Sequence, residues 1–394
     1  MTAIGAPSAE AVTVGIALVA TMAAYALFAG ADFGGGIWDL AAGSSPRGRR
    51  ARDAIDASVT PVWEGNQVWI VLGLVLLWTG FPSAFAAITI TLFVPLAVSV
   101  LGLVLRGVGF GFRHEAVHPA SKRLTGALFA CSSLLAPFFL GTAVGAVTTG
   151  RIPVPSHGLS TSAWTTPTAL VTGDLFVAAC AFIGAVYLVG DARRRGQEDL
   201  VRYFGHRAVL SGAVTGVLAG VNLALLHGSA PYVFGRLTGV ALPLVVVSVL
   251  AGAAALTLIL LHRQWLLRIF GALSVAAVVA AWGLAQYPWL FPTHLSLAAA
   301  AEPGASQIAE IVVIGMVLVL VVPSFAFLYW LQQHGRLEHD SASTQLRRAA
   351  RAQNRATAPA PATSASPPRP APLLAAAVIA LAAIRIARGR HRFW

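Results

Sequence analysis

The sequence predicts an all-α integral membrane protein. Hydrophobic residues make up 57% of the chain and charged residues 11%, whereas soluble domains average about 25% charged residues. Apolar stretches of about 20 residues recur along the chain, long enough to cross a hydrocarbon core about 30 Å thick. The first two stretches each hold an acidic residue within a polar motif, and acids are expensive inside a bilayer and usually serve a function.

About nine transmembrane helices account for the apolar stretches, since each crossing needs about 20 residues. In chain order we expect spans at 11–41, 57–79, 83–106, 124–148, 168–190, 208–228, 238–261, 268–289 and 308–331. Cys131 and Cys180 fall within the fourth and fifth spans without a C-x-x-C spacing, so we interpret them as core residues.

The basic residues orient the helices. With these spans, all of the 27 Lys and Arg residues except Arg151 and Arg236 fall on one side, in its loops and in the tail. Arg106, at the end of the third span, is counted with these loops. Positively charged loops stay in the cytoplasm, so the N-terminus is expected outside and the C-terminus inside.

The end of the chain differs in composition. Residues 333–394 are polar and basic and then rich in Ala and Pro, which is typical of a largely disordered segment. We therefore expect a membrane domain at 1–332 followed by a cytoplasmic tail that is attracted to anionic lipid. Despite the net charge of +12, nucleic-acid binding is not expected.

Two polar motifs interrupt the first two spans. The segment 30–36 places Asp32 late in the first span, and the segment 63–69 (Trp-Glu-Gly-Asn-Gln-Val-Trp) places Glu64 early in the second. At about 1.5 Å per residue, both acids lie roughly 10–14 Å from the cytoplasmic side. We expect two buried acids that face a common polar path, with hydrogen-bonding groups from Asn66 and Gln67. Burial disfavours the charged carboxylate, which suits such a group to carry protons.

The other members of the two motifs have packing roles. Gly30 and Gly34 have the small-x-x-x-small spacing that lets helices approach closely. Trp63 and Trp69 flank Gly65, and at least one tryptophan is expected to face a partner helix or a cofactor edge. The alternative for the acids is a purely structural role, in which amide side chains satisfy both carboxyl groups.

The histidines argue against a haem site in this chain. All ten fall in loops, at span ends or in the tail, whereas a haem at mid-membrane would need an axial ligand there. No H-E-x-x-H, Ser-His-Asp or Walker pattern is found. We therefore expect neither a catalytic residue nor a metal site in this chain.

The two motifs, in this order on the first two spans, resemble those of subunit II of the cytochrome bd quinol oxidase family. That family has Asp-Gly-x-Asp-x-Gly-x-Gly late in its first helix and Trp-(Asp/Glu)-Gly-Asn-(Gln/Glu)-Val-Trp early in its second. The second pattern is complete at 63–69, whereas Ala29 replaces an acid in the first pattern. The resemblance covers 11–332 and leaves out the tail.

The resemblance implies nine helices in two four-helix bundles plus a peripheral helix, packed against a haem-bearing subunit I. That partner carries haem b and haem d, oxidises quinol and reduces oxygen to water in the bacterial plasma (inner) membrane. This chain would pair with and stabilise subunit I, bind no cofactor tightly, contact lipid and quinone, and leave room for small accessory subunits. Asp32 and Glu64 match acids implicated in delivering cytoplasmic protons toward haem d.

A proton-coupled secondary transporter is the competing interpretation, because buried acids and glycine-broken helices are also expected there. A transporter would purify as an active single chain or homo-oligomer without pigment. An oxidase subunit would purify with a second, haem-containing polypeptide.

The orientation predicts the labelling of two introduced cysteines. In a background that lacks Cys131 and Cys180, Ser156→Cys should react with an impermeant thiol reagent on intact cells, because its loop is expected outside. Ser343→Cys in the tail should react only after the membrane is opened. Labelling of position 343 with protection of position 156 would reverse the topology.

Overall fold

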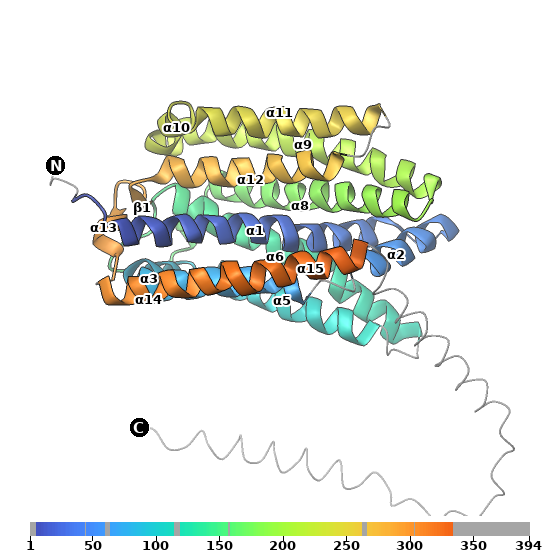
Figure 1. Ribbon diagram of the computed structural model, residues 1–394, viewed down its shortest axis with the longest axis horizontal. Helices are drawn as coiled ribbons and strands as arrows, with labels where there is room; N and C mark the ends of the chain where they lie inside the picture. Colours follow the sequence, from blue (N-terminus) through green and yellow to red (C-terminus); the bar gives the residue numbers. More distant parts are fainter. Residues whose placement is uncertain are drawn as a thin grey trace, which may run out of the picture. The chain divides into compact units, whose positions relative to one another are not determined.

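The computed structural model describes residues 5–43, 45–59, 64–113, 119–156, 158–261, 266–302 and 304–333. These residues are almost entirely helical, which confirms the all-α class (Figure 1). A two-stranded hairpin, β1 (Trp289–Phe291) with β2 (Leu295–Ser296), is a small exception that the sequence did not predict. Trp63 lies outside the described residues, and so does the expected tail apart from Gln333, the last residue of the final helix.

The N-terminal half of the chain supplies helices of very different lengths. They are α1 (Ala9–Ala41), α2 (Pro46–Val59), the 3₁₀ turn η1 (Gly65–Gln67), α3 (Val68–Gly80), α4 (Pro82–Thr91), α5 (Phe93–Arg113), α6 (Pro119–Thr148), α7 (Thr161–Trp164) and α8 (Pro167–Arg194). The C-terminal half continues the helical pattern. It contains α9 (Glu198–Ser229), α10 (Pro231–Leu237), α11 (Leu242–Leu260), α12 (Leu267–Gln286), α13 (Leu297–Ala300), α14 (Gly304–Met316), the π-helical turn η2 (Val317–Val321) and α15 (Val322–Gln333).

Seven helices of the described residues are long and apolar enough to cross a membrane. They coincide with the predicted spans in α1, α6, α8, α9, α11, α12 and the α14–α15 segment. The predicted spans 57–79 and 83–106 fall on α3, α4 and α5. Here α3 and α4 pass the same test only as a bent pair, which gives up to eight crossings, and Phe93–Gly109 is a shorter apolar helix. The count of nine, the two-bundle arrangement and the orientation therefore stay predictions.

The second predicted span begins later than expected. Residues 57–59 belong to α2, and the continuous helix α3 starts only at Val68. The segment between them that the structure describes is a turn at Glu64 and the 3₁₀ turn η1. The prediction placed Glu64 inside a helix, and this placement is wrong.

A sharp bend separates α3 from α4, whose axes differ by 117°. Pro82 is the first residue of α4 and has no N–H to continue the hydrogen bonding of α3. The Gly80 carbonyl accepts a hydrogen bond from the Glu302 backbone N–H at 3.0 Å. The buried Glu310 side chain on α14 accepts the hydroxyl hydrogen bond of Thr79. Segments far apart in the sequence therefore stabilise the bend.

Helix α1 occupies the middle of the helical domain. In Figure 1 it runs between a group formed by α8, α9, α11 and α12 and another that includes α3, α5, α6, α14 and α15. Buried side chains of α1, α2, α8 and α9 share one hydrophobic cluster, including Trp38, Ile55, Phe182 and Phe204. The Trp38 indole N–H donates to the Ala181 carbonyl at 2.8 Å, which ties α1 to α8. Residues on α1 can therefore contact both groups of helices.

The glycines late in α1 permit this central position. A methyl group added at Gly34 would collide with the Cys180 carbonyl and would lie 2.8 Å from the Gly184 Cα atom, so α1 and α8 cross with almost no space between their backbones. A methyl group at Gly35 would lie 3.0 Å from the Val59 side chain on α2. At Gly30 the nearest atoms would lie at ordinary contact distances of 3.6 Å. Gly34, more than Gly30, allows the close crossing.

Gly34→Ala should therefore destabilise the protein, because the added methyl group has to separate α1 from α8; overpacking of this kind costs about 1–3 kcal/mol. Gly30→Ala is the matched control. It should be neutral or stabilising by up to about 1 kcal/mol, because Ala favours the helix over Gly. Unfolding in mixed detergent micelles would measure both variants. Equal stability of the two would show that the crossing tolerates a side chain.

Candidate functional site

A buried polar network surrounds Asp32, which lies on α1 and is 3% exposed. Asn66, in η1, donates from Nδ2 to Asp32 Oδ2 at 2.8 Å and more weakly to the Phe28 carbonyl at 3.3 Å. The Tyr329 hydroxyl on α15 donates to Asn66 Oδ1 at 3.1 Å. Asn66 is 1% exposed. It links the Asp32 carboxyl group to the phenol of Tyr329, which is 263 residues away in the sequence.

The sequence around Asn66 explains this linkage. Because 65–67 form a 3₁₀ turn, the Asn66 side chain projects from a short irregular segment beside α1. A methyl group at Gly65 would lie 3.2 Å from the Phe325 ring, so glycine lets α15 approach the turn. Tyr329 follows one helical turn after Phe325 and reaches Asn66.

A buried arginine provides the positive charge at this site. Arg106, on α5, is 2% exposed, and its Nη2 donates to the Asp32 backbone carbonyl at 2.6 Å. Its Nη1 donates to the Ser133 hydroxyl on α6. The guanidinium lies 4.5 Å from the ring centre of Phe129 and 5.1 Å from that of Phe33, which stabilises a cation in an apolar setting. Its charge and that of ionised Asp32 attract each other.

The third glycine of the run makes room for this arginine. A methyl group at Gly36 would collide with the Ser133 hydroxyl and would lie 3.0 Å from Arg106 Nη1. The placement of Arg106 in a cytoplasmic loop is therefore wrong. The residue continues the α5 helix and turns inward to the acid on α1. Its position directly after the apolar stretch 93–105 was the only signal in the sequence.

Aromatic rings enclose the network on one side. The Trp69 ring stacks on Phe28 with ring centres 6.0 Å apart and lies 5.4 Å from Phe325. Phe28 lies 5.4 Å from Tyr329. Trp69 is 8% exposed, so it faces other helices of this chain, as expected for at least one tryptophan of the motif.

Glu64 and Gln67 are placed differently from Asp32 and Asn66. Glu64 is exposed at the turn before η1, and Gln67 is half-buried. The expectation of two buried acids is thus wrong for this chain by itself, because Glu64 lies in a turn before η1 and is exposed. Asn66, the residue between them that points inward, contacts Asp32.

A second charged cluster lies near the ends of α8 and α12. Asp191 Oδ1 accepts hydrogen bonds from Arg194 and Arg268. Arg268 Nη2 also donates to the Tyr187 carbonyl at 2.9 Å, and its guanidinium lies 5.2 Å from the Tyr187 ring centre. A side chain at position 190 would collide with Arg268, so Gly190 leaves the path for this arginine. Sequence reasoning did not identify this cluster.

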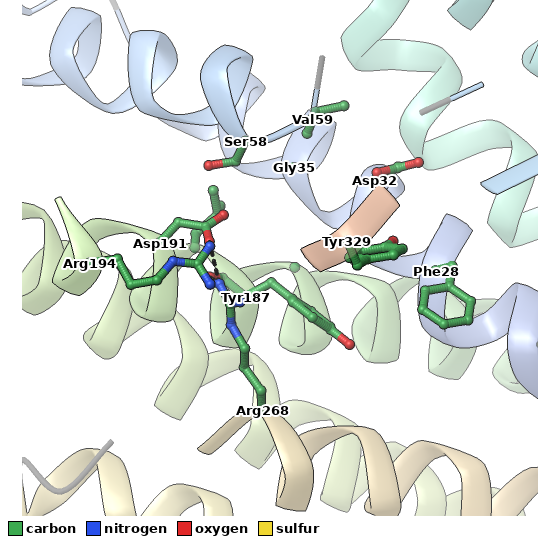
Figure 2. A pocket seen from close by; sticks show the side chains of 13 residues that line it. Phe28, Asp32, Gly35, Ser58, Val59, Tyr187, Asp191, Arg194, Arg268 and Tyr329 are labelled. Atoms are coloured by element: carbon green, nitrogen blue, oxygen red, sulfur yellow. Dashed lines mark hydrogen bonds and ion pairs between the residues drawn. The ribbon is translucent and has the colours of Figure 1, made fainter. Parts of the chain in front are cut away.

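A small cavity separates the two polar groups. Its volume is about 40 Å³, and its lining includes Asp32 and Tyr329 as well as Tyr187, Asp191 and Arg268. In Figure 2 the Asp191 cluster and Asp32 lie at opposite ends of this lining, with the two tyrosines between them. Among the described residues, no three His, Cys, Asp or Glu side chains form a group that could hold a metal ion.

Comparisons with known proteins agree on one family. A family model described as cytochrome bd terminal oxidase subunit II matches residues 11–332. The chain is 30% identical over 112 residues to the cytochrome bd ubiquinol oxidase subunit 2 of Bacillus subtilis (strain 168). That segment covers 28% of this chain and 32% of the relative, so the match spans about a third of the relative's length.

The fold also has a solved counterpart. A chain in the structure of bd oxidase from Geobacillus thermodenitrificans superposes with a TM-score of 0.65 at 22% identity, covering 82% of this chain and 98% of that chain. At this identity the similarity establishes the fold.

The buried charges of Asp32 and Arg106 should depend on each other. Arg106→Gln should destabilise the protein by about 3–5 kcal/mol, because it leaves an uncompensated buried carboxylate. Adding Asp32→Asn to Arg106→Gln should restore part of that loss, and a double-mutant cycle of unfolding free energies would measure it.

Arg50→Gln is the control for this cycle. Arg50 pairs with Asp199 at 2.7 Å with 60% of the Arg50 side chain exposed, and such surface pairs contribute about 1 kcal/mol or less. Strictly additive effects of Arg106→Gln and Asp32→Asn would mean that the two charges do not interact.

Proposed function

The chain belongs to the cytochrome bd terminal oxidase subunit II family, and from this premise we propose that it works as subunit II of a bd-type quinol oxidase. It is a multi-pass protein of the bacterial plasma membrane. In the proposed complex, quinol is oxidised and oxygen is reduced to water. Haem b and haem d, which supply the redox chemistry, are held by a haem-bearing subunit I, which this chain binds and stabilises.

The main observation that supports the proposed role of this chain is the burial of Asp32 in a connected polar network. Reduction of oxygen to water consumes protons, so a buried catalytic centre needs a route for them. The Asp32 carboxyl group can take up and release a proton, and Asn66 holds one of its oxygens in place. Arg106 offsets the negative charge after the proton leaves, which lowers the cost of an ionised acid within the membrane.

Glu64 and Gln67 extend the proposed path to the surface of the chain. Glu64 is exposed, and the helix that follows presents Val68 and Val71 with exposed fractions of 39% and 57%. An ionisable residue beside an apolar surface is poorly suited to lipid. It suits contact with another protein. We place this surface against subunit I, so that protons held at Asp32 pass by Asn66, Gln67 and Glu64 toward the partner.

A proton-coupled transporter would use similar buried acids. Membership of an oxidase subunit family argues against that alternative. Purification of the membrane complex in mild detergent separates the two proposals. The oxidase subunit should be isolated with a second polypeptide and a reduced-minus-oxidised haem spectrum, and a transporter with neither.

Asp32→Asn and Glu64→Gln should each cause a several-fold loss of quinol oxidase turnover while the haem spectrum is preserved. Each substitution keeps the shape and hydrogen bonding of the side chain and removes the proton that it carries. Turnover of the purified complex with quinol would measure the loss, and Glu64→Asp should recover part of it.

Asp199→Asn is the matched control for Asp32→Asn, because Asp199 is a surface acid paired with Arg50. Its turnover should remain that of the wild type. Normal turnover and charge translocation in the Asp32→Asn, Glu64→Gln double variant would rule out a proton path through these acids. Loss of haem together with turnover would indicate a structural role.

A further inference from the structure

The cavity beside Asp32 lies between five helices, and Arg194 and Arg268 are among the residues that line it. Residues of α1, α2, α8, α12 and α15 line it. Along α8 the lining runs from Gly184 to Arg194, the last residue of that helix. It also reaches Ser58 and Val59, the last two residues of α2. The cavity therefore extends from the buried acid toward the end of the domain that the basic residues assign to the cytoplasm.

The charged residues that line the cavity differ in exposure. Asp32 is 3% exposed, whereas the side chains of Asp191, Arg268 and Arg194 are 9%, 23% and 37% exposed. The charged cluster thus connects the interior of the cavity with the aqueous side. Glu64 is not part of the lining, so this connection is separate from the second polar motif, at 63–69.

The size and chemistry of the cavity suit water. One water molecule needs about 10–15 Å³ of such space and two to four polar partners, so about 40 Å³ accommodates about three. Polar partners come from the carboxyl groups at both ends and from Ser58, Tyr187 and Tyr329 along the walls. A short chain of waters can therefore join Asp191 to Asp32.

We propose that this cavity is a hydrated proton inlet to Asp32 and that the Asp191–Arg194–Arg268 cluster is its mouth. The proposal rests on the proposed function, in which Asp32 takes up protons, and it names the place where they enter. A proton arrives from bulk water at the mouth, moves by exchange between hydrogen-bonded waters, and protonates the Asp32 carboxylate. No electron moves in this step, and no covalent bond other than O–H bonds is broken or formed.

The charges at the mouth form a barrier that Asp191 reduces. Two guanidinium groups share one carboxylate, so the mouth is positively charged and disfavours the entry of free cations, protons included. The Asp191 carboxylate lowers this barrier locally and holds both arginines at the side of the opening. Protons can pass by exchange between waters, which does not require a hydrated ion to enter the cavity.

Filling the cavity tests the inlet without changing a charge. Ala31 lines the cavity on α1, and Ala31→Leu in the assembled oxidase should lower quinol oxidase turnover several-fold with an unchanged haem spectrum. The solvent deuterium isotope effect on turnover should rise, because proton delivery becomes rate-limiting. Ala23→Leu is the matched control, since Ala23 is also a partly buried residue of α1 but does not line the cavity. It should match the wild type in both measurements.

Substitutions at the mouth provide a second and independent test. Asp191→Asn should lower turnover several-fold and raise the isotope effect, and Asp191→Glu should restore both. Asp199→Asn, at an exposed ion pair, should change neither. If Ala31→Leu prevents assembly of the complex, the comparison of the two Asp191 variants decides the question.

The outcomes separate the inlet from the proposed function. If Asp32→Asn slows turnover while Ala31→Leu and Asp191→Asn behave like their controls, the inlet is wrong and the proton role of Asp32 stands. If Asp32→Asn has no effect, the proposed proton role itself is wrong. Loss of haem, or lower turnover without a higher isotope effect, in the Ala31 and Asp191 variants would assign these residues to structure and overturn the inlet.

Discussion

The burial of Asp32 and Arg106 next to each other inside the membrane domain is the constraint on which the rest of the site depends. Both groups are almost fully buried, and neither charge is tolerable alone in an apolar interior. Arg106 therefore needs the Asp32 backbone carbonyl, the Ser133 hydroxyl and two aromatic rings, and Asp32 needs Asn66. These contacts bring α1, α5, α6 and η1 together at one point.

The packing of α1 follows from the same requirement. A central helix must lie close to several neighbours if one of its side chains is to be enclosed by all of them. The run of glycines after Asp32 removes the side chains that would keep α8, α2 and the Arg106 group at a distance. On the other side, aromatic rings of α1, α3 and α15 pack together beside the network. Polar groups are therefore buried between a face of α1 in close backbone contact with its neighbours and a face covered by aromatic rings.

The helical class, most of the spans and the contact between the two polar motifs could be predicted from the sequence. Long apolar runs and an acid within one of them carry that information locally. Other features depend on tertiary structure. Arg106 appeared to end a span because arginine is usually interfacial, and only its partners on α1 and α6 explain its burial. Glu64 appeared buried because a helix was continued through 60–67, where the described part forms a turn. The Asp191 cluster joins residues 77 positions apart in the sequence, and no local pattern indicates such a pair.

The glycine run also limits how this chain can diverge. Gly34, Gly35 and Gly36 are adjacent in the sequence, yet each would contact a different neighbour: α8 at Cys180 and Gly184, α2 at Val59, and the Ser133–Arg106 pair. A larger residue at one of these positions could be accommodated only by a change on its own opposing helix. Correlated substitution among relatives should therefore split into three separate pairings, although the three positions are consecutive. Substitutions at these three positions should therefore correlate with substitutions on the opposing helices more strongly than with one another.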